Sequence, residues 1–150
     1  MVVALDMDGT IADLYGVEGW RDALLKEDVR PYLEAAPLVD VGALNRAIAD
    51  LHGAGHSVQV VSWNCGGNPS WEYVRAVIAA KLEWLERVGV RGLDHVHVVS
   101  HGTPKQNVVS GEGVLFDDDR RNRASWEASG KGRAYDATRL VERLAAIARA

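Results

Sequence analysis

Short apolar runs alternate along this chain with longer segments in which apolar residues recur every three or four positions. Buried strands are predicted where the runs occur, at 2–5, 57–61, 95–99 and 113–116, with a fifth short strand at 133–135. Helices are predicted from the helical spacing, at about 41–52, 69–88 and 120–129, and again near the C-terminus. Strands that alternate with helices indicate an α/β fold of three layers, with a central, mainly parallel five-stranded sheet.

Polar residues and glycines predict where these helices begin and end. Asp40 is a suitable N-cap for the helix at 41–52, and Asn68 followed by Pro69 is a suitable start for the next one. Gly130 is suited to the C-terminal end of the helix that begins after Asp119. Asp136 is predicted to cap the terminal helix.

Residues 11–39 form the least regular stretch, which we interpret as a small insert in a single domain of residues 1–150. A short helix is predicted at 20–27, and Pro31 and Pro37 interrupt the remainder of the insert. The insert comes directly after an acidic loop, so it could overhang a site there as a rudimentary cap, but it could equally be a plain connection. Tyr15 and Trp20 could accordingly close a pocket or form a small satellite core.

Chemically active side chains lie just past the predicted strands. Asp6 and Asp8 come after the first strand, Ser62 after the second and Asp117 after the fourth, while Lys105 lies in the loop region beyond the third. Because ligands of such sheets bind outside the carboxyl ends of the strands, we expect these residues to meet at one edge.

This set of residues fits phosphoryl transfer. Asp6 and Asp8 repel each other where a buried strand becomes a loop, unless a cation lies between them or one of them reacts. Mg²⁺ prefers oxygen ligands and usually takes one or two carboxylates. Ser62 and Lys105 can donate hydrogen bonds to phosphoryl oxygens, and Gly9 allows a sharp turn whose N–H groups could face an anion.

Composition and charge limit the class of protein and the cellular compartment that the sequence fits. The 150 residues carry 17 Lys and Arg against 21 Asp and Glu, a formal charge of −4 that argues against a general nucleic-acid or membrane-surface binder. The one cysteine, Cys65, cannot form an internal disulfide, and no apolar run approaches the ~20 residues of a membrane span. A cytoplasmic protein is expected, either a monomer or a homodimer.

The order of these motifs resembles the haloacid dehalogenase (HAD) superfamily, in its phosphatase majority. Leu-Asp6-Met-Asp8-Gly9-Thr10 matches the first motif, Val-Val-Ser62 the second, Lys105 the third and Leu-Phe-Asp117-Asp118 the fourth. The motifs extend from residue 6 to residue 118. The family's sheet order would place the first strand between the second and the fourth.

The resemblance implies a role for each matching residue. Asp6 would be the nucleophile that forms an aspartyl phosphate, and Asp8 the general acid and base. The Mg²⁺ ligands would be Asp6, the main-chain carbonyl of Asp8, Asp117 and Asp118. The phosphate and substrate would be bound by Gly9, Thr10, Ser62 and Lys105. Trp63 and Asn64 directly follow the motif serine, so they could contact a substrate group such as a base, or Trp63 could belong to the packing.

The expected activity is a Mg²⁺-dependent phosphatase for a small phosphomonoester. The Phe-Asp-Asp-Asp, Asn122 and Tyr-Asp-Ala pattern is similar to the deoxyribonucleotidase branch and to small phage-encoded relatives, which favours a nucleotide, although the insert is shorter than a deoxyribonucleotidase cap. A 3′-phosphatase for nucleic-acid ends is one alternative, and a non-catalytic module that binds Mg²⁺ or phosphate is another. The basic residues Arg120, Arg121, Arg123, Lys131 and Arg133 could hold a second phosphate or a nucleic-acid backbone, or form a solvated helix face.

Other kinds of site fit the sequence less well. A response-regulator receiver carries its phosphorylated aspartate after a middle strand, whereas Asp6 comes after the first. His95, His97 and His101 have no suitably spaced cysteine or acid to complete a tetrahedral zinc site. Cys65 has no neighbour in sequence that would make it a nucleophile.

Overall fold

A five-stranded parallel sheet forms the centre of the computed structural model, which describes residues 1–150. Its strand order is β5-β4-β1-β6-β7, and every neighbouring pair is parallel. The strands are β1 (Val2–Leu5), β4 (Ser57–Trp63), β5 (His95–Val99), β6 (Gly113–Phe116) and β7 (Ala134–Tyr135). The predicted three-layer α/β fold is therefore confirmed, with the first strand between the second and the fourth of the sheet.

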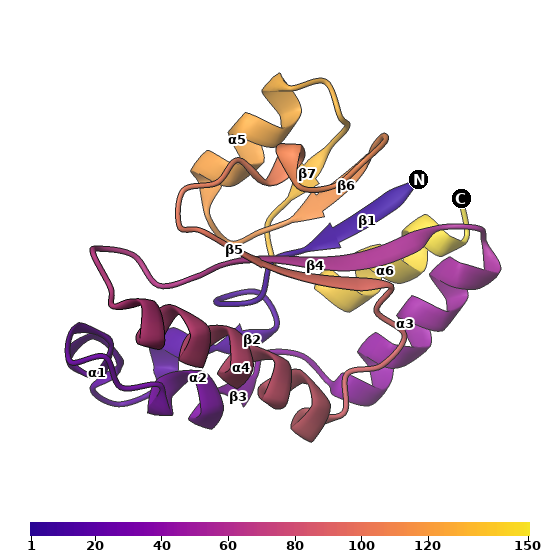
Figure 1. Cartoon of the computed structure of the whole chain (residues 1–150). Coiled ribbons are helices and arrows are strands. Elements are labelled where there is room, and N and C mark those ends of the chain that lie inside the picture. Colours follow the sequence, from indigo (N-terminus) through magenta and orange to yellow (C-terminus); the bar gives the residue numbers. More distant parts are fainter.

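Helices cover both faces of this sheet. The long helices are α3 (Val41–Gly53), α4 (Trp71–Val88), α5 (Arg120–Ala128) and α6 (Leu140–Ala148). Figure 1 shows α5 on one face and α3, α4 and α6 on the other. None of the helices combines the length and apolar character needed to cross a bilayer.

The hydrophobic core lies in two layers because side chains alternate between the faces of each strand. Val3, Leu5 and Phe116 belong to the larger layer, which also contains residues of α3 and α6. Ala4 and Leu115, one position away, belong to a smaller layer around Trp126 of α5. The central strands are thus buried on both faces of the sheet. For this reason their sequences are continuous apolar runs.

Residues 11–39 form a small substructure of their own, at the lower left of Figure 1. It contains β2 (Ala12–Asp13), the 3₁₀ helix η1 (Leu14–Gly16), α1 (Trp20–Leu25), α2 (Arg30–Glu34) and β3 (Ala36–Pro37). β2 pairs antiparallel with β3. The Tyr73 hydroxyl of α4 donates to the carbonyl of Asp28 at 3.1 Å, and the Ser70 N–H donates to Glu27 at 2.7 Å. The insert is therefore held against the start of α4.

Three predicted boundaries were wrong. β4 continues through Ser62 and Trp63 because these residues pair with Val98 and Val99 of β5, so Ser62 lies in the strand and not after it. Ser70, not Asn68, caps α4, because its hydroxyl accepts a hydrogen bond from the Tyr73 N–H.

The third wrong boundary concerns the terminal helix. Asp136 accepts hydrogen bonds from Thr138 and does not cap α6. The N-cap position is held by Arg139 in the left-handed conformation, at φ 56°. The side chain of Asp136 is used in a local turn with Thr138, before the helix begins at Leu140.

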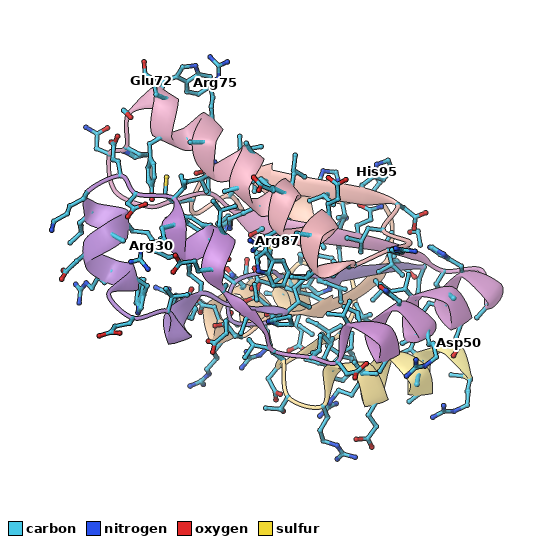
Figure 2. The ribbon with its side chains drawn as sticks, turned by 90° about the horizontal axis from the view of Figure 1, so that it is seen from below. Arg30, Asp50, Glu72, Arg75, Arg87 and His95 are labelled. Atoms are coloured by element: carbon cyan, nitrogen blue, oxygen red, sulfur yellow. The ribbon has the colours of Figure 1, made fainter.

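Charged side chains of the helices point outward, as expected for a three-layer fold. In Figure 2 Glu72 and Arg75 project from the first turns of α4, and Asp50 lies on the outer side of α3. The polar groups that do enter the interior are concentrated at one end of the sheet.

Candidate active site

The carboxyl ends of β1 and β6 bring Asp6 and Asp117 together. Both residues are buried, at 6% and 1% exposure, and both line a cavity of about 400 Å³. Lys105 reaches the same place from η2 (Lys105–Asn107), a 3₁₀ helix after β5. The expected convergence of these residues at one edge of the sheet is present.

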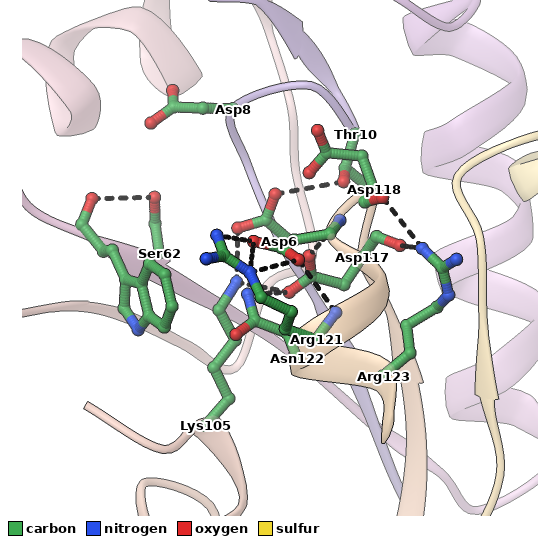
Figure 3. Close-up of polar contacts among 12 residues, drawn as sticks. Asp6, Asp8, Thr10, Ser62, Lys105, Asp117, Asp118, Arg121, Asn122 and Arg123 are labelled. Atoms are coloured by element: carbon green, nitrogen blue, oxygen red, sulfur yellow. Dashed lines mark hydrogen bonds and ion pairs between the residues drawn. The ribbon is translucent and has the colours of Figure 1, made fainter. Parts of the chain in front are cut away.

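Lys105 joins the two carboxylates. Its ammonium group donates a short hydrogen bond to Asp6 and lies 2.7 Å from Oδ2 of Asp117 (Figure 3). Burial alone would lower the pKa of Lys105, but the charges of Asp6 and Asp117 outweigh it and raise this pKa above its ordinary value. Lys105 is therefore a fixed positive charge beside the Asp6 carboxylate.

The loop after β6 is held by the first turns of α5. The Asp119 N–H and the Asn122 side-chain amide donate to the Asp117 carboxylate at 2.8 and 3.0 Å. The guanidinium of Arg123 donates to the carbonyls of Asp117 and Asp118 at 2.7 and 2.8 Å. Asn122 and Arg123 thus orient the acidic loop.

The acidic side chains at this end of the sheet carry more negative charge than Lys105 balances. Burial, and after it the charge of Asp6, raises the pKa of Asp117. The same two causes raise the pKa of Asp118 to about 7, although this residue is partly open to solvent. No side chain donates a hydrogen bond to the Asp118 carboxylate, and Lys105 is the one cation in contact with the trio. Three carboxylates against one lysine leave the site short of positive charge.

A divalent cation fits this shortage. Asp6, Asp117 and Asp118 each offer a carboxylate oxygen, and these oxygens lie within 4.8 Å of one another. No other group of His, Cys, Asp or Glu in the chain has such spacing. An all-oxygen set of this kind suits a hard ion such as Mg²⁺. His95 and His97 lie beside each other, and His97 also contacts Gln59 at 3.1 Å.

Asp8 lies apart from the Asp6, Lys105 and Asp117 group (Figure 3). Its Oδ2 accepts a hydrogen bond of 2.5 Å from Lys81, a fully buried residue of α4 that also donates to the Ser62 hydroxyl at 2.7 Å. Burial raises the pKa of Asp8, although the charge of Lys81 opposes this. The sequence analysis did not identify Lys81 as a site residue. The available signal was a charged residue at helical spacing with the apolar Val77 and Leu85, in the helix predicted at 69–88.

The polar groups of Gly9 and Thr10, which were expected to bind phosphate, are hydrogen-bonded within the protein. The Gly9 N–H donates to the carbonyl of Ala12 at 2.8 Å, so it is not free to bind an anion. The Thr10 hydroxyl donates to Oδ2 of Asp6 at 3.1 Å and orients that carboxylate. The N–H groups of Met7 and Asp8 have no acceptor within the protein, so they are the donors of this loop that remain available.

Aromatic side chains line the outer part of the cavity. Trp63 lies beside His101 with ring centroids 4.8 Å apart and ring planes tilted by 53°, and Tyr15 meets Trp20 of the insert edge to face at 5.0 Å. Asn64 also lines the cavity, but its side chain already bonds to the carbonyl of Val74 and to Cys65. Trp63, Tyr15 and Trp20 are therefore the better placed contacts for a substrate.

The predicted basic cluster is divided in the structure. Arg121 lies at the cavity, but its side chain is 86% exposed and pairs with Asp119. Arg123 is used in the acidic loop, and Lys131 donates to backbone carbonyls of residues 109 and 111. Arg121, Arg123 and Lys131 thus each have a partner within the protein.

Gly9 is required by the close approach of the acidic loop. It has φ +85°, and a Cβ placed on it would lie 2.3 Å from Oδ2 of Asp118. We expect Gly9→Ala to lower the free energy of unfolding by about 1 kcal/mol or more, because the backbone is strained and Asp118 must move. Thermal unfolding measures this. Gly53→Ala, at a helical position with open space, is the control and should be nearly neutral; equal stability of both variants would contradict the explanation.

Comparison with known proteins identifies the fold. The sequence matches no family model and no curated protein. A candidate HAD-like phosphatase from Mesorhizobium loti has a similar structure, with a TM-score of 0.58, 21% identity, and coverage of 99% of this chain and 86% of that one. D,D-heptose 1,7-bisphosphate phosphatase from B. bronchiseptica, solved with magnesium and phosphate, has a TM-score of 0.54 and 15% identity. The match covers 99% of this chain and 96% of that one.

The enzyme of the same name from Burkholderia thailandensis has a TM-score of 0.51 and 23% identity, with 86% of this chain and 73% of that one covered. These similarities extend over most or all of the chain, which includes the sheet and its covering helices. The position of β1 between β4 and β6 is the sheet order that the resemblance to the HAD superfamily implied. The chain therefore has the three-layer α/β fold of the HAD-like phosphatases.

Proposed function

We propose that this protein is a Mg²⁺-dependent phosphohydrolase that cleaves small phosphomonoesters through an aspartyl-phosphate intermediate. The observation that carries the proposal is the meeting of Asp6, Lys105, Asp117 and Asp118 at the carboxyl ends of β1 and β6, beside a cavity of about 400 Å³. The fold similarity supports it, because proteins of this fold include phosphatases and one of them was solved with magnesium and phosphate.

Asp6 is the nucleophile in this proposal. Thr10 and Lys105 each hold one of its carboxylate oxygens. An Asp6 oxygen attacks phosphorus, and the bond from phosphorus to the leaving oxygen breaks. Mg²⁺ held by Asp6, Asp117, Asp118 and the Asp8 carbonyl would supply positive charge beside the phosphoryl oxygens. The Ser62 hydroxyl and the N–H groups of Met7 and Asp8, which have no strong acceptor within the protein, would donate to those oxygens.

Asp8 moves the protons. In the protonated form it donates its proton to the leaving oxygen, and as a carboxylate it then takes a proton from the water that attacks the intermediate. Hydrolysis releases inorganic phosphate and restores the Asp6 carboxylate. The raised pKa of Asp8, caused by its burial, favours the protonated form that the first step needs.

Asp8→Asn should separate substrates by their leaving group. We expect turnover of an alkyl phosphate to fall about 10²- to 10⁴-fold, since its alkoxide leaves poorly without a proton. Turnover of 4-nitrophenyl phosphate should fall much less, because nitrophenolate is a good leaving group. Steady-state kinetics on both substrates measure the two losses; equal losses would argue against Asp8 as the general acid.

A nucleoside monophosphate is the substrate that we propose. The aromatic rings of Trp63, His101, Tyr15 and Trp20 line the cavity, and such rings suit contact with a planar base. A phosphosugar is the second candidate, because two proteins of similar structure are heptose bisphosphate phosphatases. A nucleic-acid end finds less support, since Arg121, Arg123 and Lys131 are engaged elsewhere.

The test is turnover of a panel of phosphomonoesters with Mg²⁺ and with EDTA. The panel contains nucleoside 5′- and 3′-monophosphates, sugar phosphates, 3′-phosphorylated oligonucleotides and 4-nitrophenyl phosphate. Metal-dependent release of phosphate, fastest from a nucleoside monophosphate, is expected. Fastest release from a sugar phosphate or an oligonucleotide would replace the nucleotide assignment. No release from any compound would favour a non-catalytic Mg²⁺- or phosphate-binding module.

A further inference from the structure

Lys81 is a lysine in the interior of the protein. It lies in the middle of α4, is 0% exposed, and lies on the face of the helix that carries Val77, Trp84 and Leu85. Lysine is almost never fully buried without a partner, because removing its charge from water is costly. Its partners therefore explain its place in the molecule.

The ammonium group of Lys81 uses all of its donors within the protein. It donates to Oδ2 of Asp8 at 2.5 Å, to Oγ of Ser62 at 2.7 Å and to the carbonyl of Trp63 at 2.8 Å. An ammonium group has three N–H donors, so none is left for a substrate. The ring of Tyr32, 5.1 Å away, covers the cation from the insert. Lys81 is thus fully engaged in holding neighbouring groups.

These contacts orient two groups, Asp8, which lines the cavity, and Ser62, which is 0% exposed. Since Lys81 donates to Oγ of Ser62, the hydroxyl hydrogen is directed elsewhere, and its one protein acceptor is the Trp63 carbonyl at 3.5 Å, a weak contact. Oδ2 of Asp8 is anchored, whereas Oδ1 accepts no hydrogen bond from the protein. Ser62 can therefore donate, and Asp8 keeps one oxygen free.

Lys105 contacts a different pair of side chains from the pair that Lys81 holds. It contacts Asp6 and Asp117 and makes no hydrogen bond to Asp8 or Ser62. The two lysines come from different elements, α4 and η2, and each joins the side chains of two separate strand ends or loops. The charges of Asp6 and Asp8, two residues apart, are consequently balanced by separate cations.

We infer that Lys81 is a positioning residue that holds Asp8 and Ser62 in their working orientations, separately from the Lys105 contacts with Asp6 and Asp117. The inference rests on the proposed phosphohydrolase function. Lys81 does not bind substrate or metal in this arrangement. Its removal should therefore affect proton donation by Asp8 more than binding of the phosphate or of Mg²⁺.

The test compares wild type, Lys81→Met, Asp8→Asn and the double variant on 4-nitrophenyl phosphate and on an alkyl phosphate. The quantity is the ratio of the two kcat values, aryl over alkyl, in which effects of Ser62 on phosphate binding cancel. We expect Lys81→Met to raise this ratio about 10-fold or more. In the Asp8→Asn background the same substitution should leave the ratio unchanged, since Lys81 acts on it through Asp8. Lys26→Met, at an exposed position, is the control.

Two further measurements keep the outcome decisive. Where Lys81→Met alone does not fold, Lys81→Gln, which keeps a polar donor in the interior, replaces it and should likewise raise the ratio. A wild-type ratio in whichever of the two variants folds would overturn the inference. Lys81→Met should keep the Mg²⁺-dependent rise in melting temperature. Loss of that rise, or a higher KM with an unchanged ratio, would overturn the inference while wild-type turnover keeps the proposed function. No wild-type turnover would overturn both.

Discussion

Asp6→Asn is expected to reduce turnover by about 10³-fold or more while the protein stays folded. Asparagine has nearly the same size and can still accept a hydrogen bond from Lys105 or Thr10, but its amide cannot form the aspartyl phosphate. The loss should appear in kcat for aryl and alkyl phosphates alike, because the nucleophile is needed whatever group leaves.

Stability should be unchanged or slightly higher in Asp6→Asn without metal. Lys105 keeps its contact with Asp117 at 2.7 Å, and the repulsion among three neighbouring carboxylates is reduced. Thermal unfolding in EDTA and steady-state kinetics are the measurements. Asp50→Asn, on the outer side of α3 (Figure 2), is the control and should behave as wild type. Near-normal turnover of a folded Asp6→Asn protein would refute the covalent mechanism.

Asp117→Ala should abolish activation by Mg²⁺ and the stabilisation that the ion gives. Binding to the folded form alone raises stability with the logarithm of metal concentration, by about 2.7 kcal/mol at 100 times Kd. For a chain of this length that corresponds to about 5–10 °C in melting temperature. Asp117 is 1% exposed and lies between Lys105 and Asn122, so its removal takes away a preoriented ligand that no neighbour can replace.

Asp118→Ala should weaken both effects less, because the Asp118 carboxylate is more open to solvent and no side chain orients it. Differential scanning fluorimetry across a Mg²⁺ series, with Asp50→Ala as the control, compares the variants. A wild type that shows neither stabilisation nor activation in millimolar Mg²⁺ or Mn²⁺ would refute the metal assignment. A full Mg²⁺ shift in Asp117→Ala would refute this ligand alone.

Much of the acidic centre was predictable from the sequence. Asp6 and Asp117 each come directly after an apolar run, and parallel strands of one sheet have their carboxyl ends at the same edge, so their meeting is a consequence of strand order. The order itself agrees with the resemblance to the HAD superfamily. Lys105 was also expected there, although its place between the two carboxylates depends on how η2 folds back over the sheet.

The contacts of Gly9, Thr10 and Asn64 were less predictable. Each lies in or beside a motif, which indicated phosphate or substrate binding. In the structure their polar groups are used in turns and in support of Asp6, because loop N–H groups and amides take the nearest acceptor or donor. A motif names the residues of a loop, whereas their hydrogen bonds depend on the path of the backbone.

The strands, the helices and the edge of the sheet where the acids meet were already implied by the linear pattern of residues, because burial on one or both faces imposes a period on that pattern. The role of Lys81, in contrast, depends on tertiary structure. Helical spacing placed it on the inner face of α4 with Val77 and Leu85, but that spacing describes direction around the helix axis alone. Its partner Asp8 lies 73 residues away, and the crossing of α4 over the ends of β1 and β4 brings the two within 2.5 Å.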